Sequence, residues 1–302
     1  MSPRTSDALA RIEALVCRDV GRKTQGLIEA TRGELAAAAG TLASASSVGL
    51  ITGFFVPRGD VAAPETDGPG GTALLAASLA ACGVKARIAV DTPCAVAVRA
   101  AVAAAGESSV AVDEIADVAG IAAAIETWRK AGVGHAVSIE RCGRSPDGKP
   151  RNMRGVDVSP WTLPLDDLFV AGTWKRLAVG DGGNEIGMGK LRRALIAENV
   201  PNGAAIASVT SCDHLIVAGV SNWGAYGLMA ALAVLKPEWR ETILRFLSAE
   251  RDLSVTCAIV KQAGAVDGVT ARAEPTVDGF GAEVHGALVD QLCRIAGGKT
   301  AD

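Results

Sequence analysis

The stretch KARIAVDTPCAVAVRAAVAAAGESSVAVD, residues 85–113, contains two short apolar runs separated by a longer alanine-rich run. The outer runs, 85–91 and 109–113, have the length of buried strands. The middle run, 94–106, is long enough for a helix and ends at a glycine. A strand, a helix and a second strand in this order form a right-handed crossover between parallel strands. The stretch therefore predicts a parallel sheet.

The same alternation of strands and helices continues on both sides of this stretch, from residue 47 to residue 199. Short apolar runs predict further strands, and longer runs with helical spacing predict further helices. The expected strands are 47–55, 135–140 and 175–180, and the expected helices are 71–83 and 120–132. We therefore expect an α/β fold with a mainly parallel sheet and helices on both faces.

Two helical stretches, 7–20 and 24–39, precede the first expected strand. No linker or internal repeat divides the sequence, and 302 residues suffice for one large domain. We expect a single domain over residues 1–302, with the N-terminal helical segment 1–45 packed against the sheet.

The composition indicates a globular protein with a large core and excludes several classes of partner. Of the 302 residues, 49% are hydrophobic and 21% are charged. The net charge of −3 and the lack of a basic tract argue against nucleic acid and membrane surfaces as partners. Seven scattered cysteines without a CxxC pair predict reduced thiols. With no apolar signal-peptide core at the N-terminus, we expect a cytoplasmic protein. The sequence is also compatible with a homo-oligomer.

Polar loops follow the expected strands. They are 52–71, 140–155 and 180–189, and the short SCDH segment, 211–214, follows or interrupts a further apolar run, AAIASVT. Ligands of open parallel sheets bind beyond the carboxyl ends of the strands. We therefore expect these loops to converge on one site.

The glycine-rich loop GDGGNEIGMG, residues 180–189, matches neither common phosphate-binding pattern. The dinucleotide-binding pattern G-x-G-x-x-G would begin at Gly180, but Glu185 stands where its third glycine is needed. Asn184 stands where a P-loop needs its first glycine, and Leu191 replaces the serine or threonine. We expect no nucleotide cofactor.

The loop nevertheless has features of a binding site. Its glycines, including Gly182 and Gly183, would let backbone approach a small ligand closely, and its N–H groups could accept an anion. The carboxylates of Asp181 and Glu185 could hold a cation or an ammonium group. The alternative is a helix start, with Asn184 as the cap and an acid in the first turn.

Three further segments contribute candidates. Arginine matches carboxylates in bidentate geometry, so Arg141 and Arg154 suit an acidic substrate, with Glu140 beside them. Asp67 either joins the same edge or caps the helix that follows it. Asn222 begins another expected helix and is a further candidate. By pattern alone, Cys212 is a core cysteine and TVDGF, residues 276–280, is a plain turn.

Taken together, the segments ETDGPGG, RNMRGVDVS, GDGGNEIGMG and SNWGAYGL resemble the C-terminal domain family of D-glutamate cyclase. The resemblance extends from about residue 10 to residue 296. It implies cyclisation of D-glutamate to 5-oxo-D-proline with loss of water, a hydro-lyase reaction. It also implies that the longer relatives carry a further N-terminal domain.

This chemistry needs a base for the amine, an acid for the leaving oxygen and a positive charge near the carboxylate. Glu140, Asp181 and Glu185 are candidates for these roles and are not separated by sequence. Oxygen ligands such as Asp181 and Glu185 would suit Mg²⁺ or Mn²⁺. The candidates for substrate binding are Arg141, Arg154, Asn184, Gly182, Gly183, Asp67 and Asn222. The alternatives are a phosphate- or nucleotide-using enzyme and a non-catalytic protein that binds a small acidic metabolite.

Overall fold

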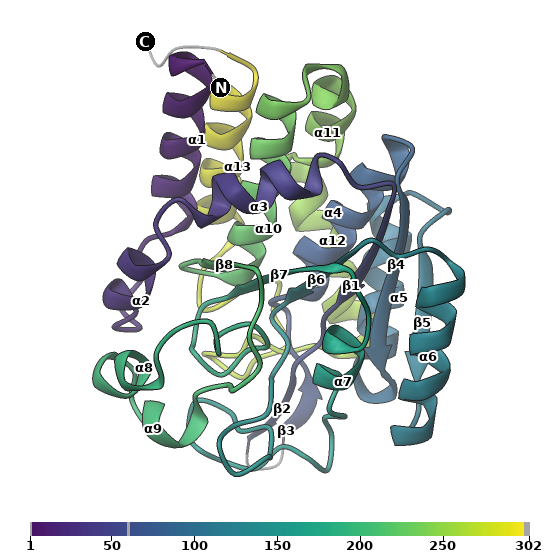
Figure 1. The fold of residues 1–302 in the computed structure, drawn as a ribbon, viewed down its shortest axis with the longest axis vertical. Helices are drawn as coiled ribbons and strands as arrows, with labels where there is room; N and C mark the ends of the chain where they lie inside the picture. The colour runs from purple at the N-terminus through teal and green to yellow at the C-terminus, as the bar shows by residue number, and fades with distance from the viewer. Residues whose placement is uncertain (1, 59–60, 299–302) are drawn as a thin grey trace.

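An all-parallel sheet of six strands forms the centre of the computed structural model, which describes residues 2–58 and 61–298 (Figure 1). The strand order is β5-β4-β1-β6-β7-β8, so the chain builds the sheet outward first on one side of β1 and then on the other. The strands are β1 (Ser47–Ile51), β4 (Lys85–Asp91), β5 (Ala111–Ile115), β6 (His135–Ile139), β7 (Lys175–Gly180) and β8 (His214–Val217). This confirms the expected fold class. The order reverses between β1 and β6, where open sheets of this kind bind ligands.

Helices cover both faces of the sheet, as expected, and each face has its own hydrophobic core. One layer contains α1 (Pro3–Val16), α3 (Glu34–Leu42), α4 (Pro69–Ala81), α5 (Thr92–Ala105), α10 (Ser221–Leu235), α11 (Arg240–Phe246), α12 (Ala249–Ala263) and α13 (Ala282–Ala296). A 3-10 turn, η1 (Pro237–Trp239), separates α10 from α11. The other layer contains α2 (Gln25–Ala30), α6 (Val118–Lys130), α7 (Asp166–Val170), α8 (Arg193–Asn199) and α9 (Gly203–Ile206).

Small residues let the two most buried helices, α4 and α10, approach the sheet and each other. A Cβ atom at Gly224 would lie 2.3 Å from Val179 of β7. A Cβ atom at Gly71 would lie 2.9 Å from Ala225 of the neighbouring helix. Real Cβ contacts are not that short, so larger residues would push the layers apart. The first turns of both helices therefore lie directly at the edge of the sheet.

Three predicted boundaries are corrected by the structure. The helical stretch 24–39 is two helices, α2 and α3. The helical backbone is interrupted between them, and Gly33, just before α3, has a φ of 89°. The run 47–55 ends as a sheet strand at Ile51, and Phe55 begins an antiparallel hairpin of β2 (Phe55–Arg58) and β3 (Val61–Pro64). The AAIASVT run contains α9 rather than a strand, so the SCDH segment leads into β8 and does not join the expected site.

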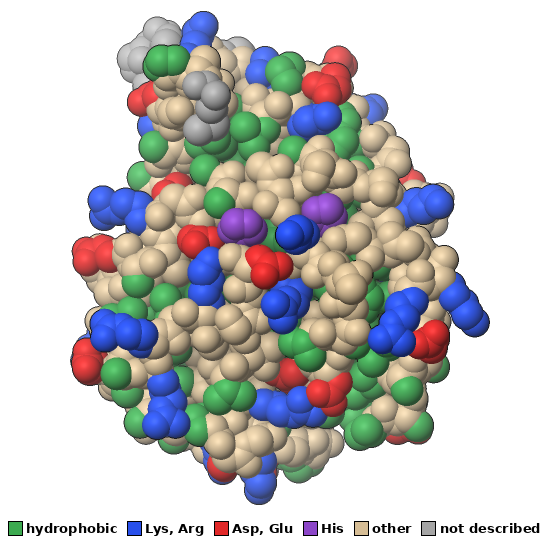
Figure 2. Space-filling model, in the orientation of Figure 1, with side chains coloured by type: hydrophobic (Ala, Val, Ile, Leu, Met, Phe, Trp, Pro, Cys, Tyr) green, Lys and Arg blue, Asp and Glu red, His purple; other side chains and the backbone are tan. Residues whose placement is uncertain are grey.

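No helix within the described ranges is long and apolar enough to cross a bilayer. Basic and acidic side chains are interspersed on the face of the molecule that Figure 2 shows. The seven cysteines are free thiols, and Cys212 is buried, as predicted.

Candidate functional site

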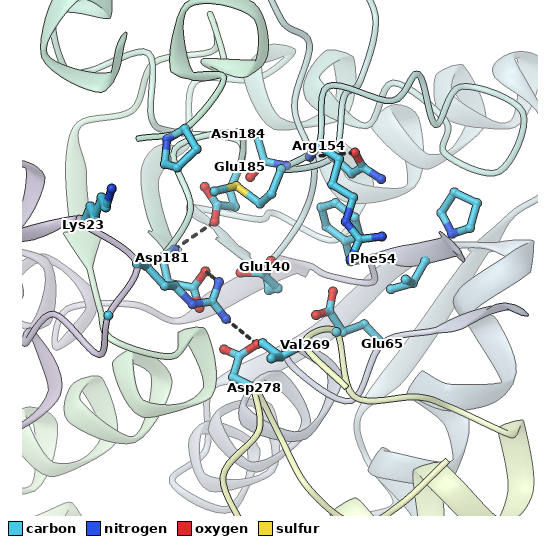
Figure 3. A pocket seen from close by; sticks show the side chains of 18 residues that line it. Lys23, Phe54, Glu65, Glu140, Arg154, Asp181, Asn184, Glu185, Val269 and Asp278 are labelled. Carbon is cyan, nitrogen blue, oxygen red and sulfur yellow. Dashed lines mark hydrogen bonds and ion pairs between the residues drawn. The ribbon is translucent and has the colours of Figure 1, made fainter. Parts of the chain in front are cut away.

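A cavity of about 400 Å³ opens where β1, β6 and β7 end, at the reversal of the strand order (Figure 3). Its lining is mostly acidic on one side, and an apolar wall carries Phe54 on the other. The charged residues that line it are Arg22, Lys23, Glu65, Glu140, Arg154, Asp181, Glu185 and Asp278. The expected convergence of the loops after β6 and β7 is thus present in the structure.

Glu185 closes the glycine-rich loop on itself. Its carboxylate accepts hydrogen bonds from the backbone N–H groups of Asp181 at 2.9 Å, Gly182 at 2.6 Å and Gly183 at 2.7 Å. The N–H groups that we expected to receive a ligand anion therefore already hold an anion from the chain itself. Glu185 lines the cavity, but the geometry assigns it to holding the loop in shape.

Neighbouring side chains, rather than a ligand, lie close to the two loop glycines, and only Gly183 also has a left-handed φ. Gly183 has a φ of 98°, and a Cβ atom there would lie 2.8 Å from Ile196. A Cβ atom at Gly182 would lie 2.7 Å from the sulfur of Met153. Neither glycine lines the cavity, in contrast to the expected backbone approach to a substrate.

Asn184 joins the loop after β7 to the loop after β6. Its side-chain amide donates to the backbone carbonyl of Arg151 at 2.8 Å, and its backbone carbonyl accepts from the N–H of Gly143 at 2.9 Å. A backbone bridge between Cys142 and Glu185 continues the same contact. Asn184 lines the cavity and does not cap a helix, so the helix-start alternative is not what the structure shows.

Arg141 does not reach the cavity, which corrects its expected role as a direct substrate ligand. Its side chain is 1% exposed and pairs with Asp91 at 2.6 Å. The guanidinium also donates to the carbonyls of Gly53 and Leu163, at 2.9 and 2.6 Å. Arg141 thus ties together the segments that follow β1, β4 and β6, since a buried charge is stable only when it is paired.

Asp67 and Asn222 cap each other's helices. The Asp67 carboxylate accepts from the backbone N–H groups of Ser221 and Asn222 at 2.9 and 2.8 Å, at the start of α10. The Asn222 side-chain oxygen accepts from Gly68 and Gly71 at 3.0 and 2.8 Å, at the start of α4. Asp67 therefore caps α10 rather than the helix that follows it in sequence. Neither side chain lines the cavity.

Arg22 and Asp278 are two site residues that the sequence motifs did not predict. Arg22 donates to Asp181 at 2.7 Å and also forms an ion pair with Asp278 (Figure 3). The described carboxylates of Asp67, Asp181 and Asp278 lie within 4.8 Å of one another around it. Arg22 lies in a loop between two helices, where no sequence pattern marks a functional arginine. Asp278 lies in the segment 276–280, which is a turn, as its sequence predicted.

Glu140 is held in an unusual backbone conformation at the end of β6. Its φ is 44°, rare for a residue other than glycine, and its carboxyl group accepts a 2.6 Å hydrogen bond from Ser221. A Cβ atom at Gly68 would lie 2.8 Å from the Glu140 Cβ. The sharp turn directs the Glu140 side chain into the cavity, beside Asp181.

Four buried carboxyl groups in or next to the cavity have raised pKa values. Burial, with Asp181 and other acids nearby, raises the pKa of Glu140 well above its ordinary value. Burial also raises the pKa of Glu65 and of Asp181, although the Arg22 charge opposes the rise at Asp181. Burial raises the pKa of Asp67 to about 7. Perturbed acids in a cavity are typical of functional sites.

Two basic side chains stand at the edges of this acidic site. Lys23 and Arg154 line the cavity on opposite sides of the carboxylates, and both are exposed (Figure 3). Neither forms an ion pair with any residue in 2–58 or 61–298. Arg154 is the predicted substrate-binding arginine that the structure does place at the cavity.

A divalent cation at Asp181 and Glu185 remains a prediction. The described carboxylates of Glu140, Asp181 and Glu185 lie within 4.8 Å of one another, which is close enough for a shared ion. The three backbone hydrogen bonds to Glu185 and the Arg22 pair of Asp181 leave these two residues few free oxygen atoms. Mg²⁺ is commonly bound through one or two carboxylates and keeps several waters, so an ion here would be held by the oxygen atoms that these contacts leave free.

The fold and the cavity define a parallel α/β protein with a cluster of buried acids at the switch point of its sheet. The family model described as D-glutamate cyclase-like, C-terminal, matches residues 12–293, and the chain belongs to this family. The resemblance noted from the loop motifs is thereby confirmed.

A curated relative that matches is human mitochondrial D-glutamate cyclase, which is 33% identical over 250 residues. The aligned region covers 78% of this chain and 40% of the human protein. The chain therefore spans less than half the length of that relative.

Proposed function

We propose that the chain cyclises an acidic α-amino acid, D-glutamate, to 5-oxo-D-proline with loss of water. Family membership supports this reaction, and the observation that carries it is the placement of Arg22, Asp181 and Glu140 in one cavity. Asp181 is directly paired with Arg22, whereas the largest influences on Glu140 besides burial come from neighbouring acids. Two carboxyl groups in such different surroundings suit opposite roles, one as base and one as acid.

The base is Asp181. Its ion pair with Arg22 favours the ionised form over that of Glu140, while burial keeps it more basic than an exposed aspartate. An ionised Asp181 accepts a proton from the substrate ammonium group and frees the amine for attack on the δ-carboxyl carbon.

The acid is Glu140, because its raised pKa favours the protonated form and Ser221 orients its carboxyl group. The ammonium group loses two protons and the departing oxygen gains two, so the carboxyl groups only relay protons. Arg154 binds the α-carboxylate, the one group that does not react, and holds the chain folded for an intramolecular attack.

The test is 5-oxoproline formation by the purified chain from D-glutamate and from L-glutamate. We expect turnover of the D form, reduced by about 10²–10⁴-fold in Glu140→Gln. Glu238→Gln, the same change at an exposed site, should keep the parent rate. Tight binding of D-glutamate without product would contradict the proposal and favour a non-catalytic binding protein.

A further inference from the structure

The cavity is larger than the proposed substrate requires. A molecule of about ten non-hydrogen atoms, such as glutamate, fills roughly 150 Å³ at the packing density of a protein interior. The cavity measures about 400 Å³, within the range of sites that enclose considerably larger ligands. Glutamate placed against the carboxyl groups would leave more than half of this volume free.

An apolar wall borders the cavity. Phe54, Val56 and Pro57 line it from the start of the hairpin, and Met153 lines it from the loop after β6. Figure 3 shows Phe54 on the same side of the cavity as Arg154, away from Asp181 and Asp278. Such a wall gives water no hydrogen-bond partner and suits an apolar group.

The wall is a built feature with a small core of its own. Phe54 packs with Cys142 and Val158 in a cluster separate from the two main cores, and Val56 and Trp161 pack against it. The ring of Phe55 also stacks on Trp161, with centroids 6.2 Å apart. These contacts connect the hairpin to the loop after β6 and hold Phe54 and Val56 in place, whereas Met153 packs against the core on one face of the sheet.

The chemistry of the reaction gives this space a use. A δ-carboxylate repels nucleophiles because it is negatively charged, whereas a δ-amide or δ-ester carbonyl is neutral. An acid beside the carbonyl serves either substrate, since it can protonate a departing nitrogen as well as a departing oxygen.

We propose that the site also cyclises γ-amides and γ-esters of glutamate, with the leaving amine or alcohol against the wall of Phe54, Val56, Pro57 and Met153. This proposal rests on the proposed function, because it uses the same amine, base and acid. The bond between the α-nitrogen and the δ-carbon forms, and the bond from the δ-carbon to the leaving nitrogen or oxygen breaks. The ammonium group loses two protons in all: Asp181 takes the first, and the carboxyl groups pass one to the leaving atom through Glu140, while the other is released to solvent. No water or co-reactant is consumed.

The test uses γ-D-glutamyl-p-nitroanilide with the full chain. We expect nitroaniline and 5-oxoproline in equal amounts, with kcat/KM at least tenfold above that for D-glutamate. Turnover of D-glutamate with no turnover of the anilide would overturn this inference alone, whereas failure of both substrates would overturn the proposed function. Nitroaniline released with glutamate rather than 5-oxoproline would be hydrolysis and would also contradict the inference.

Variants of the wall test where the leaving group binds. Val56→Asp and Met153→Gln place polar groups on the wall, from two separate segments. Each should lower kcat/KM for the anilide at least tenfold more than kcat/KM for D-glutamate, with melting temperature measured alongside. An equal effect on both substrates in both variants would show that the wall does not contact the leaving group.

Discussion

The guanidinium of Arg22 lies 2.7 Å from Oδ1 of Asp181, and the side chains of the two residues are 22% and 1% exposed. Arg22 comes from the loop between α1 and α2, whereas Asp181 directly follows β7. The N-terminal helical segment is thus part of the site, because it delivers a cation to the carboxyl ends of the strands. The other oxygen of Asp181 has no hydrogen-bond partner among the described residues.

Replacing Arg22 tests whether this cation keeps Asp181 active as a base. Arg22→Gln keeps a polar side chain but removes the charge, so Asp181 should become protonated and turnover should fall about 10²–10⁴-fold. The measurement is the rate of 5-oxoproline formation near neutral pH. Arg129→Gln, which breaks an exposed pair with Glu126, is the matched control and should keep the parent rate. Parent-level activity of Arg22→Gln would exclude this role.

The raised pKa values predict how stability depends on pH. The folded state binds protons on Glu140 and Asp181 more tightly than the unfolded chain, in which such groups titrate near about pH 4. The contribution of these two groups to the free energy of unfolding should therefore be largest at acidic pH. It should fall as the pH rises from about 4 through the higher folded-state values.

Thermal melting of Glu140→Gln beside the parent isolates this effect from all other groups. The variant cannot ionise, so its melting temperature relative to the parent should increase steadily between pH 5 and about pH 8. A difference that stays constant over this range would show that Glu140 carries its charge in the folded protein. A bound cation that stabilises the ionised form would have that effect.

The glycine-rich loop predicts a contrast between two neighbouring substitutions. Gly183 has a left-handed φ and no room beside Ile196, whereas Gly182 meets the flexible side chain of Met153. Gly183→Ala should therefore lower the melting temperature clearly more than Gly182→Ala. Equal melting temperatures for the two variants would contradict this account of the loop.

The motifs predicted the sheet, the converging loops and most of the acids of the cavity. Apolar runs alternate with helices over residues 47–199, and the polar loops that follow them must meet at one edge when the strands are parallel. Glu140, Asp181, Asn184, Glu185 and Arg154 all line the cavity for this reason.

The remaining features depend on tertiary contacts that no local pattern encodes. Arg141 looked like a substrate ligand because its loop is basic, but its partner Asp91 comes from a different strand. Asp67 and Asn222 are residue types that commonly cap helices. Each caps a helix from a distant part of the sequence, Asp67 the start of α10 and Asn222 the start of α4. Arg22 gains its role only because Asp181 lies opposite it.

The most direct test of the whole account is the rate of 5-oxoproline formation by Asp181→Asn. Asparagine has nearly the same shape as aspartate but cannot accept the ammonium proton, so the fold should persist while the base is lost. The account predicts that the variant stays folded at neutral pH, because Arg22 keeps its ion pair with Asp278. It also predicts a rate lower by about 10²–10⁴-fold. A folded Asp181→Asn variant that forms 5-oxoproline from D-glutamate at the parent rate would contradict it.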